Sequence, residues 1–127
     1  MTGDPAGLIT VVIADDEPDV RRLLEVQFGL DGRFTVVGLA ADGAEALSLV
    51  GALRPDAVVM DLLMPGVNGF SAIATLQESF PEIGVVAYTG VAGDYVRAEM
   101  AARNVEVVLK SGDLRPLAQA VRRAVGR

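Results

Sequence analysis

The sequence contains no cysteine and no histidine. Without cysteine the chain cannot form disulfides, thiolate metal sites or a cysteine nucleophile, and this composition fits a reducing cytoplasm. Without histidine it lacks the commonest general base and the commonest zinc ligand. Carboxylates, hydroxyls and lysine remain as the groups from which an active site could be built.

Long apolar segments and an excess of positive charge are missing as well. The longest candidate span, LITVVIA, is far shorter than the ~20 residues that a membrane helix needs, so we expect no membrane association. The net charge of -6 would repel phosphates, so we expect no direct nucleic-acid binding. The first residues, MTGDPAG, do not have the pattern of a signal peptide. We expect a flexible tail over residues 1–7, one domain over residues 8–127 and a cytoplasmic location.

Five short runs rich in valine and isoleucine are predicted strands: ITVVIA (9–14), FTVVGLA (34–40), AVVM (57–60), IGVVAYT (83–89) and VEVVLK (105–110). They are mostly apolar on both faces, as in strands that helices cover on both sides. The segments between them have helical spacing, which is clearest for the last helix, with its apolar stripe at Leu114, Leu117, Ala118, Val121 and Val125. This alternation predicts right-handed crossovers and a parallel sheet between two layers of helices.

The predicted helices have candidate capping residues. Asp16 precedes Pro18 at the start of the first helix, and Asp113 precedes Pro116 in the first turn of the last helix. The helix expected at 93–102 has the weakest pattern because it is short and rich in alanine. Basic residues lie on or near the last helix, and we interpret them as a solvated face that complements its C-terminus rather than as a patch for a partner: Arg115, Arg122, Arg123 and Arg127.

Polar residues follow four of the predicted strands, where ligands bind in parallel sheets. They are Asp15-Asp16-Glu17, Asp61, Thr89-Gly90 and Lys110-Ser111. Each has an ordinary explanation on its own: Asp16 could be a helix cap, Asp61 a turn former before Pro65-Gly66, and Thr89 and Lys110 unremarkable strand-end residues. Their convergence on one edge is improbable as a coincidence, so we expect a site there.

The chemistry of this edge favours a magnesium ion and a phosphoryl group. Clustered carboxylates repel one another unless a cation lies between them, and hard oxygen ligands without histidine or cysteine favour Mg²⁺. Mg²⁺ and Lys110 would attract a phosphoryl group, and Asp61 could act as the nucleophile that forms an acyl phosphate. Mg²⁺, Lys110 and the Thr89 hydroxyl would then stabilise the equatorial oxygens during in-line transfer.

Roughly residues 8–125 resemble the receiver domain of two-component response regulators. The resemblance rests on ADDEP (14–18), VVGLAADGAEALSLV (36–50), DLLMPGVNGF (61–70), YTG (88–90) and LKS (109–111). It implies an α/β, flavodoxin-like (βα)5 three-layer sandwich whose central five-stranded parallel sheet has the order 2-1-3-4-5.

The resemblance also implies a role for each strand-end residue. Asp61 accepts a phosphoryl group from a sensor histidine kinase or a histidine phosphotransfer protein. Asp16 and Asp61 bind Mg²⁺ directly, together with the backbone carbonyl of Leu63, while Asp15 acts mainly through water. The remaining residues, Thr89 and Lys110, hold the phosphoryl oxygens, with the Gly90 N–H as a further donor.

Phosphorylation of a receiver shifts a two-state equilibrium that a downstream output protein or domain reads. A homodimer is one form that the resemblance leaves open. The chain differs from the family pattern at two positions: Val107 replaces an aromatic switch residue, and Ser111 replaces the proline that usually follows the lysine. We therefore expect a trans Lys110-Ser111 bond, and a signal that leaves through residues 90–96.

Three other functions remain open. A flavodoxin shares the fold, but the acidic ADDEP loop would repel its phosphate. A Mg²⁺-dependent aspartyl-phosphate phosphatase needs two aspartates one residue apart after the first strand, which Asp15-Asp16 does not match. A phosphorylation-independent interaction module would be a receiver with a vestigial site.

Leu63 and Val91 correspond to positions that border the path of attacking water in receivers, and both are apolar, so we expect slow dephosphorylation.

Overall fold

The computed structural model describes residues 7–90 and 92–127. Residues 1–6 of the predicted tail, and Val91, lie outside the described residues. Strands and helices alternate along the chain in the order β1 (Ile9–Ala14), α1 (Pro18–Leu30), β2 (Phe34–Ala40), α2 (Gly43–Leu53), β3 (Ala57–Met60), α3 (Gly69–Ser79), β4 (Gly84–Thr89), α4 (Asp94–Ala102), β5 (Glu106–Leu109) and α5 (Leu114–Val125).

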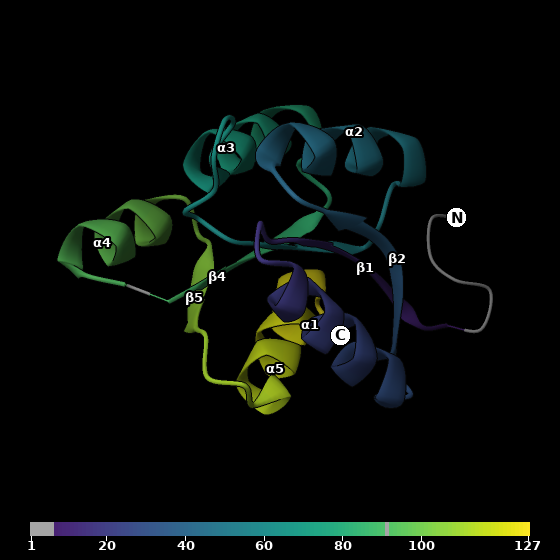
Figure 1. Ribbon diagram of the computed structural model, residues 1–127. Coiled ribbons are helices and arrows are strands. Elements are labelled where there is room, and N and C mark those ends of the chain that lie inside the picture. Colours follow the sequence, from purple (N-terminus) through teal and green to yellow (C-terminus); the bar gives the residue numbers. More distant parts are fainter. Residues whose placement is uncertain (1–6, 91) are drawn as a thin grey trace.

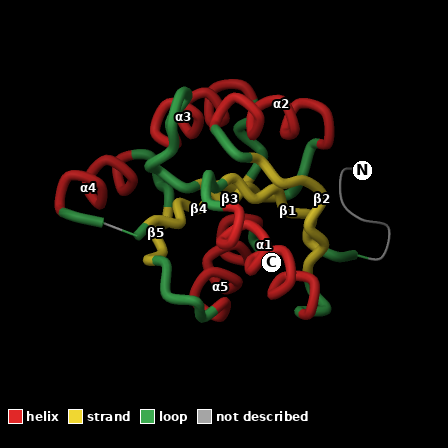
Figure 2. Tube along the Cα trace, viewed as in Figure 1, coloured by secondary structure: helices red, strands yellow, loops and turns green. Residues whose placement is uncertain are grey.

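The five strands form one parallel sheet with the order β2-β1-β3-β4-β5, which confirms the predicted fold class. Figure 1 shows α1 and α5 on one face of this sheet and α2 and α3 on the other, with α4 beside β5. The tube in Figure 2 shows the same three layers, with the strands in the middle. Because every strand runs the same way, their carboxyl ends lie on one edge.

The core consists of two layers that share the strands. Along β1, Val12 and Ala14 pack with α2 and α3, while Val11 and Ile13 pack with α1 and α5. All six residues of this strand are buried, because successive side chains of a strand point to opposite faces and both faces are covered here. This explains why every residue of the strand except Thr10 is apolar.

The ends of several elements differ by one residue from the sequence predictions. β4 begins at Gly84 rather than at residue 83, because the Ile83 N–H donates to the Phe80 carbonyl in the preceding turn at 3.1 Å. β5 spans residues 106–109 rather than 105–110. The predicted cap at Asp113 is confirmed, since its side chain accepts from the Arg115 N–H at 3.0 Å.

The predicted cap at Asp16 is wrong. Glu17 occupies the N-cap position of α1, and its side chain makes no capping hydrogen bond. Instead, Asp15 Oδ1 accepts from the Glu17 N–H at 2.9 Å, so Asp15 organises the turn that enters the helix. Asp16 is exposed and is left available for other contacts.

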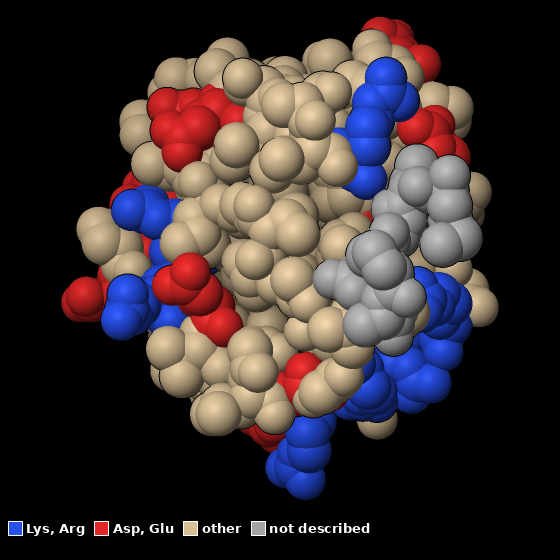
Figure 3. All heavy atoms as spheres, turned by 90° about the vertical axis from the view of Figure 1, so that its right-hand side faces the viewer, with Lys and Arg blue, Asp and Glu red and all other residues tan. Residues whose placement is uncertain are grey.

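Charged residues are unevenly spread over the surface. Figure 3 shows the side that lies to the right in Figure 1, where basic residues lie along the right border and in smaller groups at the left and the bottom, and the centre is largely uncharged. On α5, Arg123 pairs with Glu106 of β5 at 2.5 Å and Arg115 pairs with Asp113 at 2.9 Å. These pairs are consistent with a solvated helix face. No helix among the described residues is long and apolar enough to cross a membrane.

Candidate functional site

The two aspartates at the centre of the predicted site are placed by the sheet itself. The Asp61 N–H, just after β3, donates to the Ala14 carbonyl of β1 at 2.9 Å, and the Asp15 N–H donates to the Ala40 carbonyl of β2 at 3.0 Å. These bonds continue the parallel ladder beyond the last strand residues. Asp15 and Asp61 therefore lie side by side at one edge, although they are 46 residues apart in the chain.

The loop that follows Asp61 packs closely on it. A Cβ atom added at Gly69 would lie 2.1 Å from the Asp61 carbonyl oxygen and 2.6 Å from Leu62 Cα, so only glycine fits there. The Leu63 N–H donates to Asp61 Oδ1 at 3.2 Å. The DLLMPGVNG segment thus folds back over its own aspartate, and Asp61 is 4% exposed.

Three carboxylates gather at this edge. Oxygen atoms of Asp15, Asp16 and Asp61 all lie within 4.8 Å of one another, with Asp15 and Asp61 buried and Asp16 exposed. The donors are hard oxygens, and neither histidine nor cysteine exists in the chain. This donor set fits Mg²⁺, which prefers carboxylates and keeps several waters, so the exposed side at Asp16 suits it.

Lys110 is the cation that balances the buried carboxylates. Its Nζ lies 2.7 Å from Asp15 Oδ2 and 3.1 Å from Asp61 Oδ2, and Glu17 Oε1 is 3.7 Å away. Burial lowers the pKa of Lys110, but its hydrogen bonds and charge interactions with Asp15 and Asp61 outweigh burial and raise the pKa above its usual value. Lys110 is therefore an ammonium ion at neutral pH.

Opposing influences act on the pKa of Asp61. Burial, with a smaller contribution from the charge of Asp15, raises its pKa, while the Leu63 N–H and Lys110 oppose the rise. The net shift of the pKa is upward, so the ionised form of Asp61 is less stable here than the same carboxylate in water. A group that binds to this carboxylate, or a cation that screens it, would relieve that cost.

Thr89 lies at the same edge but is less directly connected. Its carbonyl accepts from the Lys110 N–H at 2.9 Å, so the two residues are joined through the β4–β5 ladder. Its side chain is fully buried, and its hydroxyl has no hydrogen-bond partner among the described residues. A buried hydroxyl without a partner is rare and marks a place where a ligand oxygen could bind.

One further residue, Arg21, reaches the site and was not assigned to it by the sequence analysis. Arg21 of α1 donates from Nη1 to the Asp15 carbonyl at 2.6 Å, and Glu17 lies beside Lys110. Arg21 occurs in a helix whose polar residues look like ordinary surface residues in the sequence. Only the helical spacing of Arg21 from the ADDEP turn, about one turn after Glu17, could have indicated the contact.

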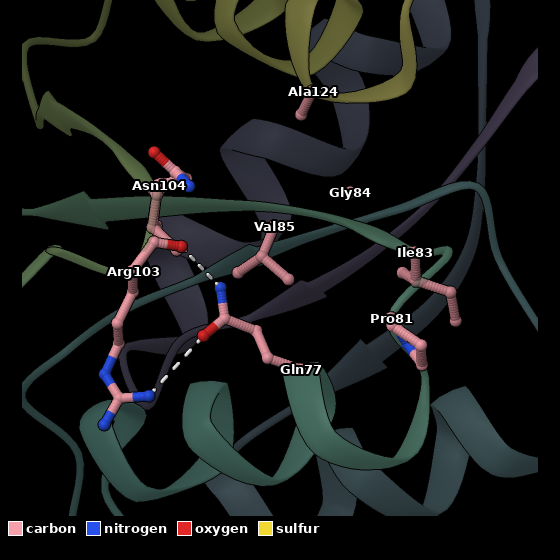
Figure 4. Close-up of a pocket in the computed structure, with 9 residues that line it drawn as sticks. Gln77, Pro81, Ile83, Gly84, Val85, Arg103, Asn104 and Ala124 are labelled. Carbon is pink, nitrogen blue, oxygen red and sulfur yellow. Dashed lines mark hydrogen bonds between the residues drawn. The ribbon is translucent and has the colours of Figure 1, made fainter. Parts of the chain in front are cut away.

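The opposite edge of the sheet carries a pocket with a cavity volume of about 330 Å³, formed where β4 and β5 begin (Figure 4). Gln77, Arg103 and Asn104 contribute its polar groups. The figure shows Gln77 spanning from α3 to the turn before β5, where its Nε2 donates to the Arg103 carbonyl at 2.8 Å. None of the described residues that line this pocket carries a carboxylate, whereas three carboxylates meet at the other edge, so we place the candidate site there.

A family model described as "Response regulator receiver domain" matches residues 11–122, which includes every residue of the site. The chain belongs to the response regulator receiver domain family. This finding agrees with the resemblance seen in the sequence, and with the strand order of the sheet.

Relatives of this receiver domain include longer proteins. A protein-glutamate methylesterase/protein-glutamine glutaminase 3 of Anaeromyxobacter dehalogenans is 46% identical over 74 residues, which are 58% of this chain and 22% of that protein. The protein-glutamate methylesterase/protein-glutamine glutaminase 4 of Myxococcus xanthus is 39% identical over 102 residues, which are 80% of this chain and 28% of that protein. The receiver domain thus spans about a quarter of these curated relatives.

Solved structures of other receivers share the fold. The response regulator domain of Thermotoga maritima CheB superposes with a TM-score of 0.85 at 24% identity, covering 94% of this chain and 98% of that chain. A LuxR-family two-component response regulator from Aurantimonas sp. superposes with a TM-score of 0.86 at 28% identity, covering 94% and 86%. These likenesses support the fold across nearly the whole receiver domain.

Proposed function

We infer that this receiver domain is a phosphorylation-dependent switch. Asp61 accepts a phosphoryl group from a sensor histidine kinase or a histidine phosphotransfer protein, in a Mg²⁺-dependent reaction, and the domain then changes conformation to regulate an output protein or domain. The observation that carries this proposal is the position of Asp61: it is buried, lies within 4.8 Å of two other carboxylates and is 3.1 Å from Lys110. We expect the protein to act in the cytoplasm.

The phosphoryl transfer needs little beyond positioning and charge. An oxygen of the ionised Asp61 carboxylate forms a bond to phosphorus while the phosphorus–nitrogen bond of the donor phosphohistidine breaks, and the departing imidazole keeps the bonding electron pair. No general base is required, because the nucleophile is already ionised at neutral pH. This is consistent with a site that contains no histidine.

Lys110 and Thr89 bind the transferred group. The Lys110 ammonium, which bridges Asp15 and Asp61, turns toward a phosphoryl oxygen as charge arrives on Asp61. The Thr89 hydroxyl, which has no partner among the described residues, donates to another phosphoryl oxygen. Asp16, Asp61 and the Leu63 carbonyl would hold Mg²⁺, with Asp15 acting through water, and the bound ion would supply positive charge near the remaining oxygens.

A small phosphodonor tests this proposal. The protein is incubated with acetyl phosphate and MgCl₂, and the product is mapped by mass spectrometry after mild digestion. We expect one modification, at Asp61, that is absent from Asp61→Asn and from protein treated with EDTA. Asp42→Asn, which changes an aspartate outside the site, should be modified like the parent.

The same experiment separates the alternatives. An acyl phosphate that persists supports the switch, whereas repeated turnover of acetyl phosphate would indicate a phosphatase. A parent protein that is never modified would indicate a phosphorylation-independent interaction module. Modification that remains in Asp61→Asn would show that another residue is the acceptor.

A further inference from the structure

The loop that carries Lys110 is short and mostly exposed. Residues 110–113 connect β5 to α5, and the loop is held at its start by the Lys110 N–H donating to the Thr89 carbonyl, and at its end by the Asp113 cap. Between these points, Ser111 and Gly112 are exposed. The backbone of Gly112 has a φ of 82°, a conformation that glycine adopts without strain but that does little to stiffen the loop.

One side chain from elsewhere in the fold holds the middle of this loop. Gln27 of α1 donates from Nε2 to the Gly112 carbonyl at 2.9 Å across 85 residues of sequence. Among the described residues, Gln27 is the only side chain from outside the loop that donates a hydrogen bond to the main chain of residues 110–113. Gln27 itself is partly buried, and its helix packs against α5, so its position is fixed by the core.

The position of Lys110 depends on this loop. Its ammonium lies between two buried carboxylates at 2.7 and 3.1 Å, and a shift of about 1 Å in its backbone would break one of these contacts. A proline after the lysine would stiffen the backbone, because its ring fixes φ, whereas Ser111 and Gly112 leave it free. The Lys110-Ser111 bond is trans, as expected, since no cis peptide bond occurs among the described residues.

We propose that Gln27 is a positioning residue for phosphoryl binding: it clamps the Gly112 carbonyl and thereby keeps Lys110 directed at Asp61. This inference rests on the proposed function of Asp61 as phosphoacceptor. Gln27 does not touch the acidic cluster, so it acts through the loop alone. Gln27 thus connects α1 to Lys110, whose ammonium must change its partners when the phosphoryl group binds.

The chain offers a matched control for this clamp. Gln77 of α3 is also partly buried and also donates from Nε2 to a loop carbonyl, that of Arg103, at 2.8 Å. It lies at the opposite edge of the sheet, beside the pocket in Figure 4. Gln27→Leu and Gln77→Leu therefore each remove a hydrogen bond from Nε2 to a loop carbonyl, and only the Gln27 bond leads to Lys110. Gln77→Leu also removes the longer bond that Gln77 Oε1 accepts from Arg103 Nη1 at 3.5 Å.

Two titrations by calorimetry measure the effect. The first measures Mg²⁺ affinity alone, which depends on the carboxylates, and the second measures beryllofluoride affinity at saturating Mg²⁺, which also depends on Lys110 and Thr89. Gln27→Leu should weaken beryllofluoride binding about two- to tenfold, the equivalent of one hydrogen bond, with Mg²⁺ affinity unchanged. Gln77→Leu should bind both like the parent, while urea unfolding should show a similar loss of stability for the two variants.

A second variant separates positioning from general loosening of the fold. In a Lys110→Met background, Gln27→Leu should cause no further loss of beryllofluoride affinity, because the group that it positions is gone. Equal beryllofluoride affinity for Gln27→Leu and the parent, or an undiminished loss in the Lys110→Met background, would overturn the clamp while leaving the proposed function intact. A parent that fails to bind beryllofluoride would overturn both.

Discussion

Replacing Asp61 with asparagine should make the metal-free protein more stable at neutral pH, although it removes the proposed phosphoacceptor. The Asp61 carboxylate is 4% exposed and lies within 4.8 Å of oxygens of Asp15 and Asp16 and 3.1 Å from Lys110 Nζ. At an effective dielectric constant of ~20, each repulsion is worth about 3.5 kcal/mol and the attraction about 5 kcal/mol. Asp16 is exposed, so water screens its repulsion and the charge interactions nearly cancel; burial of the carboxylate then decides the sign. We expect asparagine to raise the free energy of unfolding by about 1–2 kcal/mol.

The pH dependence follows from the direction of the pKa shift. The pKa of Asp61 is raised above its ordinary value of 3.8, chiefly by burial, so the folded protein binds this proton more tightly than the unfolded chain does. The stability contributed by protonated Asp61 is therefore lost as the pH rises through the raised pKa. Asp61→Asn lacks this titration, so its advantage over the parent should be absent well below pH 3.8 and complete at neutral pH.

Urea unfolding in EDTA, from neutral pH down to about pH 3, measures both effects. Asp42→Asn is the control, because Asp42 caps α2 at the surface and asparagine caps a helix equally well, so stability should change little. Added Mg²⁺ should stabilise the parent more than Asp61→Asn, which has lost a ligand. If Asp61→Asn is less stable than the parent in EDTA at neutral pH, the attraction of Lys110 dominates and the reasoning is wrong.

Three further predictions concern the metal, the lifetime and the output. Asp16→Asn should weaken Mg²⁺ binding by tenfold or more in calorimetry, on the order of 1.4 kcal/mol, and unchanged affinity would place the metal elsewhere. Leu63, which is 63% exposed, offers no polar group to orient water, so Leu63→Asn should speed loss of the phosphoryl group; an unchanged rate would remove this explanation. With Val107 at the switch position, beryllofluoride should alter hydrogen exchange at 90–103, and changes confined to 105–125 would contradict that route.

Much of the fold follows from local properties of the sequence. Runs such as ITVVIA are mostly apolar on both faces because helices cover both faces of a central parallel strand, and this pattern can be read from the sequence alone. Once the runs are recognised as strands, the residues directly after each run are known to lie at the carboxyl end of a strand. Since parallel strands end on one edge, the sequence alone predicted that Asp15, Asp61 and Lys110 would meet. The structure places Lys110 Nζ 2.7 Å from Asp15 Oδ2 and 3.1 Å from Asp61 Oδ2.

Only the tertiary structure decided which partners these residues bind and which contacts fix their positions. The sequence suggested that Asp16 caps α1, but Asp15 takes the Glu17 N–H while its other oxygen pairs with Lys110, because the ladder to β2 sets its direction. The bond from Gln27 to the Gly112 carbonyl joins residues 85 apart, and it exists because α1 and α5 pack on the same face of the sheet. Strand periodicity and strand ends are local features, whereas these contacts depend on the distance between two helices and on one side-chain rotamer, which no short stretch of sequence specifies.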